Sequence, residues 1–247
     1  MKLSISLFLF LVTFHLSSQE IINPVIEKYE KSKWTVGVNY SQNYCYRFYL
    51  TDKETLKDII EIYDGYQLPD FGYNTGINVL YKLTEKLSFE SGIKLHVNGE
   101  RTKYSDSLRW PEGGTDPKYE NLLRTKFHLR DQFFEVPLKV NYYFKRSKVS
   151  FFGSGGIIPT YIFCNKSTTY LYFIDRTEIR KSKSYWRGGN NISFTLSLSA
   201  GMDIDLFNDF ILRIEPSFRS VIFPLNDFDI KRYDYSGGMN LGFFYNL

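Results

Sequence analysis

Beyond its N-terminal segment, the sequence has no apolar run long enough to cross a bilayer as a helix. No later stretch reaches about 18 consecutive apolar residues. The formal net charge is only +4, which is too small to predict nucleic-acid binding. Two cysteines, at a spacing that fits no metal motif, and three histidines offer few ligands. The sequence therefore predicts no metal, no cofactor and no nucleic-acid partner.

The first residues have the three parts of a secretory signal peptide. Lys2 supplies the positive charge, residues 3–16 are almost entirely apolar, and Ser17 and Ser18 are small. We expect residues 1–18 to be a signal peptide and residues 19–32 to be a short periplasmic lead-in, with a domain at 33–247. An N-terminal membrane anchor is the alternative.

Aromatic residues are abundant, at 18 % of the chain, and apolar residues recur with a period of two. In residues 192–205, for example, every second residue from Ile192 to Ile204 is apolar, and Ser, Thr, Gly and Asp lie between them. A helix has a period of 3.6 and cannot separate these two sets, so each such segment predicts a β-strand.

Eight segments alternate in this way, and short and long connections alternate between them. The predicted strands are 33–49, 71–83, 87–102, 126–144, 148–164, 190–206, 209–223 and 234–247. The connections at 84–86, 145–147 and 207–209 are short, and those at 50–70, 103–125, 165–189 and 224–233 are longer. Within the first of the longer connections, the spacing of apolar residues predicts a helix near 52–63.

This pattern predicts an all-β fold: an eight-stranded, antiparallel, up-and-down transmembrane β-barrel with short periplasmic turns and longer extracellular loops. Aromatic residues gather near both ends of the strands, as in the interfacial girdles of membrane barrels. We therefore expect the cell outer membrane of a Gram-negative bacterium. A secreted β-sandwich or lipocalin-like barrel is the alternative, because alternation alone does not say which face is inside.

Four segments resemble the outer-membrane β-barrel domain proteins of Bacteroidota, often called PorT-like. They are FEVPLKVNYYF at 134–144, FGSGG at 152–156, LRIEPSFR at 212–219 and NLGFFY at 240–245. The resemblance implies a barrel over nearly the whole mature chain, and one branch of the family is an accessory of a secretion and gliding apparatus. It implies no active site. We expect the barrel-assembly machinery to recognise the last strand through Phe243 and Tyr245, and no peptidoglycan-binding domain to follow.

If the apolar face contacts lipid, charged residues fill the lumen. A lone buried ion is costly, so these charges are expected to form a structural network of ion pairs. The predicted network comprises Glu90, Lys94, Glu135, Lys139, Arg213, Glu215 and Arg219.

The sequence predicts no catalytic residue. A lipid A deacylase needs a Ser–His–acid group facing lipid, but His96 has the parity of the lumen and His128 has no serine beside it. A palmitoyl transferase needs an apolar interior, which the predicted lumen charges argue against. Glycines 153–156 lack the helix and lysine of a phosphate-binding loop.

The predicted loop 165–189 is basic and aromatic, and we consider it a candidate contact for lipopolysaccharide phosphates or for a protein partner. A loop that is merely solvated explains its charge equally well. The candidate contact residues are Lys166, Arg176, Arg180, Lys181, Lys183, Trp186 and Arg187.

Together these features predict a non-enzymatic scaffold or surface-interaction protein whose lumen is filled by side chains. The alternative is a narrow pore or an accessory subunit of a transport or secretion complex. The sequence leaves open whether Cys45 and Cys164 form a disulfide or remain free thiols.

Overall fold

The computed structural model describes residues 32–105, 121–185, 191–207, 209–226 and 228–247. The expected signal peptide and nearly all of the expected lead-in lie outside these residues. The described elements are β1 (Trp34–Leu50), η1 (Glu54–Leu56, a 3-10 helix), α2 (Lys57–Tyr66), β2 (Gln67–Lys82), β3 (Leu87–Thr102), β4 (Leu122–Glu135), β5 (Leu138–Lys145), β6 (Val149–Phe173), β7 (Thr177–Tyr185), β8 (Ile192–Asp205), β9 (Phe210–Val221) and β10 (Lys231–Asn246).

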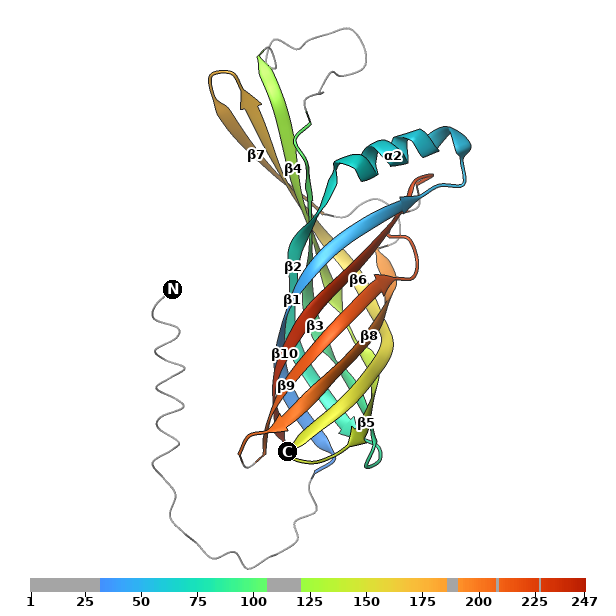
Figure 1. Ribbon diagram of the computed structural model, residues 1–247, viewed down its shortest axis with the longest axis vertical. Coiled ribbons are helices and arrows are strands. Elements are labelled where there is room, and N and C mark those ends of the chain that lie inside the picture. The colour runs from blue at the N-terminus through green and yellow to red at the C-terminus, as the bar shows by residue number, and fades with distance from the viewer. Residues whose placement is uncertain (1–31, 106–120, 186–190, 208, 227) are drawn as a thin grey trace, which may run out of the picture. The chain divides into compact units, whose positions relative to one another are not determined.

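The strands close into an antiparallel ring of eight, which confirms the predicted fold class (Figure 1). The order around the ring is β1, β2, β3, β4 with β5, β6, β8, β9 and β10, and β10 pairs with β1. β4 and β5 share one place, because both pair with β3 and with β6. The single strand predicted at 126–144 is thus interrupted at Val136-Pro137, where proline has no N–H to donate.

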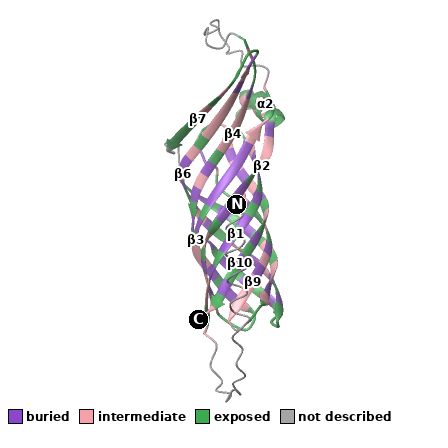
Figure 2. Ribbon diagram, turned by 90° about the vertical axis from the view of Figure 1, so that its left-hand side faces the viewer, coloured by how far each residue is buried: buried purple, intermediate pink, exposed green. Residues whose placement is uncertain are grey.

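Side chains alternate between the lumen and the outer wall, as Figure 2 shows along the barrel strands. On β8, Ser193, Thr195 and Ser197 are buried, whereas Phe194 and Leu196 are exposed. The polar set therefore points inward and the apolar set outward. A water-soluble barrel or sandwich requires the reverse arrangement, so the structure decides between the two alternatives that the sequence left open.

The short connections lie together at one end of the barrel. There the N–H of Asn246 donates to the carbonyl of Asp209 (2.8 Å), and the N–H of Leu247 donates to the carbonyl of Trp34 (3.0 Å). Trp34 also packs against Tyr81, with 4.6 Å between ring centroids. In an outer-membrane barrel the end with short turns is periplasmic, so the opposite end is external.

The predicted external loop at 165–189 is wrong for most of its length, because β6 continues to Phe173 and β7 pairs with it. A β-bulge explains the error. Gln132 and Phe133 on β4 pair with Cys164 and Ile162, so Phe163 is an extra residue on β6. The bulge reverses the inward–outward alternation beyond this point, and the period-two signal ends there although the strand does not.

β4, β6 and β7 extend beyond the ring at its external end (Figure 1). We call the part formed by residues 122–130, 166–173 and 177–185 the outer extension. β4 begins four residues before the predicted start, as β2 does. The helix expected near 52–63 is present as η1 and α2, shifted toward the C-terminus.

Among the described residues, no helix is both long enough and apolar enough to cross a membrane.

Candidate functional site

All seven residues of the predicted lumen network are buried, and they come from β3, β4, β5 and β9. β3 carries a column of inward residues along its length: Glu90, then Lys94 and His96, then Asn98 and Glu100. The ten residue-to-residue steps from Glu90 to Glu100 cover roughly 33 Å of strand. This column passes through three levels of polar side chains.

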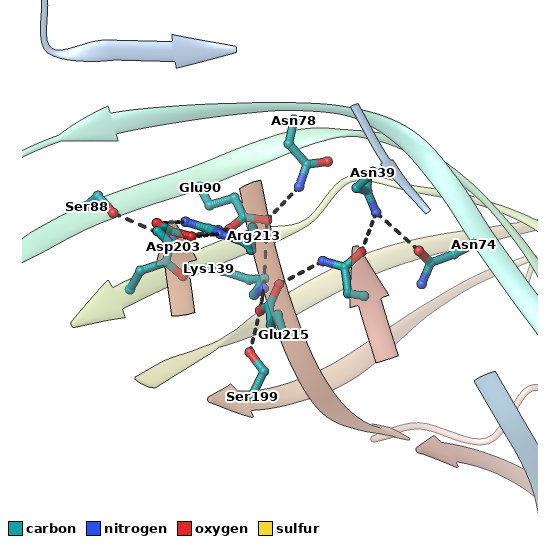
Figure 3. Close-up of polar contacts among 12 residues, drawn as sticks. Asn39, Asn74, Asn78, Ser88, Glu90, Lys139, Ser199, Asp203, Arg213 and Glu215 are labelled. Atoms are coloured by element: carbon teal, nitrogen blue, oxygen red, sulfur yellow. Dashed lines mark hydrogen bonds and ion pairs between the residues drawn. The ribbon is translucent and has the colours of Figure 1, made fainter. Parts of the chain in front are cut away.

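Arg213 is the centre of the lower level (Figure 3). Its Nη1 lies 2.8 Å from Oε2 of Glu90, and its Nε lies 2.7 Å from Oδ1 of Asp203. The guanidinium also lies over the rings of Phe152 and Phe244, at 4.4 Å and 5.0 Å from their centroids. The carboxylates therefore pair with the N–H groups of the guanidinium, and the two aromatic rings lie over its face.

Lys139 joins this level to a second carboxylate. Its Nζ lies 2.5 Å from Oε1 of Glu215 and 3.7 Å from Oε1 of Glu90. Glu215 also accepts hydrogen bonds from Ser199 Oγ (2.5 Å) and from Asn240 Nδ2 (2.8 Å). We call Glu90, Lys139, Asp203, Arg213 and Glu215 the lower cluster.

The middle level surrounds a small cavity. Arg219 pairs with Glu135, and its Nη1 lies 3.4 Å from Nδ1 of His96. These three side chains help line a cavity of about 20 Å³, which is room for one water molecule. Lys94 lies in the same column but takes no part in the ion pairs that Lys139, Arg213 and Arg219 form with the lumen glutamates.

The upper level contains five charged residues that the sequence analysis missed. Arg47, Glu100, Asp131, Arg232 and Asp234 form the upper cluster, in which each arginine contacts more than one carboxylate. Arg47 lies 3.1 Å from Asp131, and Arg232 lies 2.7 Å from Asp234. The period-two pattern could have indicated Arg47, because it is an even number of residues from the inward-facing Asn39 on β1 and so faces the lumen as well. Arg232 lay before the predicted start of its strand.

The described lumen thus buries seven carboxylates and six cationic side chains, a nearly balanced set. Two ion pairs join strands that are four places apart in the ring of eight, which is directly across the lumen. They are Arg213–Glu90, between β9 and β3, and Arg232–Asp131, between β10 and β4. Within the described residues, no group of three or more His, Cys, Asp or Glu could hold a metal ion.

The predicted contact residues of 165–189 divide between the two faces of the outer extension. Lys166 pairs in register with Lys183, and Thr168 with Lys181, so these three lysines share one face. Arg180 is opposite Thr169 and lies on the other face. Trp186 and Arg187 lie outside the described residues.

Two of the predicted contact cations are neutralised within their own hairpin. Arg176 Nε lies 2.9 Å from Glu178, and Arg180 Nη2 lies 3.1 Å from the same carboxylate. Arg176 also pairs with Asp175. These hydrogen bonds hold the pKa of the Glu178 carboxyl below its usual range. Arg176 and Arg180 therefore contribute little free charge to the surface.

The lysine face gains further cations from β3 and β4, which the sequence analysis did not assign to it. In register, Arg130 is opposite Lys166, His128 is opposite Thr168 and Arg101 is opposite His128. We call the resulting surface the basic face. It comprises Arg101, Arg124, Lys126, His128, Arg130, Lys166, Lys181 and Lys183.

Aromatic rings support the outer part of the basic face. The guanidinium of Arg124 lies 4.2 Å from the ring centroid of Tyr104 and 5.2 Å from that of Tyr172. The rings of His128 and Tyr170 are 5.4 Å apart. The residues in register with His128 are Arg101 and Thr168, so the strand pairing places no serine directly opposite it for a catalytic triad.

A family model described as "Outer membrane protein beta-barrel domain" matches residues 27–230. The chain belongs to this family. This confirms the predicted location in the cell outer membrane, and it assigns the apolar outer wall of the barrel to lipid contact. Among curated proteins, none matches the chain.

Several solved barrels are similar to this member of the family. Neisserial surface protein A is 14 % identical, with 87 % of this chain and 98 % of that chain covered and a TM-score of 0.45. OprG from Pseudomonas aeruginosa is 12 % identical, with 88 % and 98 % covered and a TM-score of 0.42. The outer membrane protease OmpT from Escherichia coli is 8 % identical, with 93 % and 100 % covered and a TM-score of 0.44.

Proposed function

We propose that this protein is a non-enzymatic outer-membrane barrel that acts as a scaffold or surface-interaction protein, with a lumen closed by side chains. The observation that carries the proposal is that two ion pairs, Arg213–Glu90 and Arg232–Asp131, cross the lumen at different levels. Each joins opposite walls, so each lies in the path that a solute would take along the barrel axis.

The width of the barrel supports a closed lumen. A ring of eight strands is just wide enough for its own side chains to fill. Here the side chains are long, and each charged group contacts two carboxylates. Arg213 contacts Glu90 and Asp203, and Lys139 contacts Glu90 and Glu215. Opening a path would leave buried charges without partners, which costs several kcal/mol for each ion.

With the lumen closed, contact with other molecules falls to the external end. The outer extension holds the exposed basic face there, and α2 lies at the same end (Figure 1). A rigid, hydrogen-bonded extension presents charges at fixed spacing, which a solvated loop does not. We therefore place the interaction surface on the extension, with outer-membrane lipid or a protein as its partner.

Two narrower parts of the proposal rest on sequence. The resemblance of 134–144 and 212–219 to the PorT-like outer-membrane barrels of Bacteroidota supports membership of that family. The aromatic residues Phe243 and Tyr245 on the last strand support recognition by the barrel-assembly machinery during insertion.

An ion-flux measurement tests the closed lumen. The purified full-length protein, reconstituted into liposomes that contain a salt-sensitive dye, should admit ions no faster than protein-free liposomes. Rapid flux that scales with the amount of protein would overturn the proposal in favour of the alternative, a narrow pore or an accessory subunit of a transport complex.

The non-enzymatic part has its own test, because His128 is the histidine on the outer wall. Replacement by alanine, His128→Ala, should leave the lipid composition of the host outer membrane unchanged. A lipid modification that depends on His128 would show that the barrel is an enzyme.

A further inference from the structure

Three cations lie side by side at the inner border of the basic face. Arg130 on β4 is in register with Lys166 on β6, and Lys166 is in register with Lys183 on β7. Directly opposed residues on neighbouring strands have Cβ atoms about 5 Å apart, and like charges at such positions are destabilising. Within the described residues, neither Arg130 nor Lys166 forms an ion pair.

The carboxylates of the same strands do not compensate the charges of Arg130 and Lys166. Asp131 and Glu135 on β4 are buried in the lumen, and β6 has no acidic residue. Glu178 on β7 is opposite Leu171, on the other face, where it pairs with Arg176 and Arg180. On these three strands, then, the acids are kept off the basic face, and a bound anion would relieve its repulsion.

The occupant is indicated by what lies below this row of cations. On β4, Phe134 and Arg130 are four residues apart and point to the same side, and Phe134 is exposed on the lipid-facing wall. Four residues at about 3.3 Å each, on a strand tilted by roughly 40°, raise Arg130 about 10 Å above Phe134. The polar headgroup layer adds roughly 5–7 Å beyond the hydrocarbon core. The row of cations therefore lies above the lipid-facing wall, within the headgroup layer or a few ångströms beyond it.

We propose that the basic face binds the phosphate groups of a phosphorylated glycolipid in the outer leaflet, with Arg130, Lys166 and Lys183 as its inner row. The inference rests on the proposed function only for the external position of the extension. Continuity with the lipid-facing wall favours a lipid over a soluble partner. Lysine and arginine side chains at this spacing suit phosphate oxygens, which accept several charge-assisted hydrogen bonds.

The test uses the folded full-length chain in detergent micelles and counts bound lipid by native mass spectrometry. The probes are diphosphoryl lipid A and the same lipid after removal of its phosphates. Diphosphoryl lipid A should bind, and its affinity should fall as sodium chloride is raised from about 50 mM to about 500 mM. The dephosphorylated lipid should bind much more weakly.

Two matched double variants place the binding on the basic face. Lys166→Gln with Lys181→Gln removes two cations from the face, and the affinity should fall roughly 10- to 30-fold. Arg176→Gln with Arg180→Gln removes two cations from the same hairpin but not from the face, and should change the affinity less than about threefold. Lys166→Arg with Lys181→Arg keeps the charge and should retain binding. Heat-dependent migration in SDS shows that each variant is folded.

Three results would overturn the inference. They are equal binding of the dephosphorylated lipid, equal losses in the two glutamine double variants, and binding of inorganic phosphate that matches binding of the lipid. These results are distinct from failure of the proposed function. A barrel that conducts ions can still bind lipid A through this face, and a closed barrel can fail to bind it.

Discussion

Arg213 on β9 and Glu90 on β3 form an ion pair across the full width of the lumen, with 2.8 Å between Nη1 and Oε2. They are 123 residues apart in sequence and on opposite strands of the ring. Neither side chain is more than 1 % exposed. The pair therefore links the two walls through the interior, and its removal has consequences for both stability and permeability.

Removing one partner should destabilise the barrel strongly. For Glu90→Gln we expect a loss of about 3–5 kcal/mol in the free energy of unfolding, because Arg213 loses one of its two carboxylates in a buried site. Urea unfolding in detergent micelles measures this loss. The double variant Glu90→Gln with Arg213→Gln should lose less than the sum of the two single variants. A loss below about 0.5 kcal/mol for Glu90→Gln would contradict the account.

Two neighbouring glycines should differ sharply in their tolerance of alanine. A Cβ on Gly156 would lie 2.2 Å from the carbonyl oxygen of Leu138, where β5 passes β6, whereas a Cβ on Gly155 would meet only Leu198 Cδ2 at 3.5 Å. Gly156→Ala should cost about 2 kcal/mol or more, and Gly155→Ala should be tolerated. Heat-dependent migration and urea unfolding compare the two variants. Equal stability would show that β5 and β6 are not this close.

Glu178 should titrate below the usual range of a glutamate, because Arg176 and Arg180 donate hydrogen bonds to its charged form. A lowered folded-state pKa means that these pairs stabilise the hairpin at neutral pH and are lost as the pH falls through that pKa. Carbon-13 NMR of a protein labelled at glutamate measures the titration. Arg176→Gln with Arg180→Gln should raise the pKa, and an unchanged titration would contradict the pairing.

Cys45 and Cys164 are free thiols in the structure, and both are fully buried. A water-soluble thiol reagent should therefore modify neither cysteine in the folded protein. It should modify both after unfolding in urea without reductant. Failure of the unfolded chain to react would indicate a disulfide, which the positions of these cysteines on β1 and β6 do not favour.

The sequence predicted the barrel well because the membrane imposes a strict pattern on it. Segments such as 87–102 must alternate lipid-facing and lumen-facing side chains, and the sequence shows this as an alternation of apolar and polar residues. The lower cluster followed from the same parity, through Glu90, Lys139, Arg213 and Glu215.

The parts that sequence missed lie where the membrane no longer dictates the pattern. Beyond the bulge at Phe163 the alternation changes phase, so the sequence predicts a loop where β6 in fact continues. The basic face also depends on register: Arg130 and Lys166 are 36 residues apart, and only strand pairing puts them side by side. The alternation within one strand does not show which cations of three different strands become neighbours.

The most direct test of the central claim is single-channel recording in planar bilayers, with a control that opens the lumen. The wild-type protein should show no stable conductance. A variant with Arg47→Ala, Arg213→Ala and Arg232→Ala shortens three lumen-filling side chains and should raise the ionic current if it folds, which shows that the recording can detect an open barrel. Reproducible channels from the wild-type protein, equal to those of the variant, would contradict a lumen closed by its ion pairs.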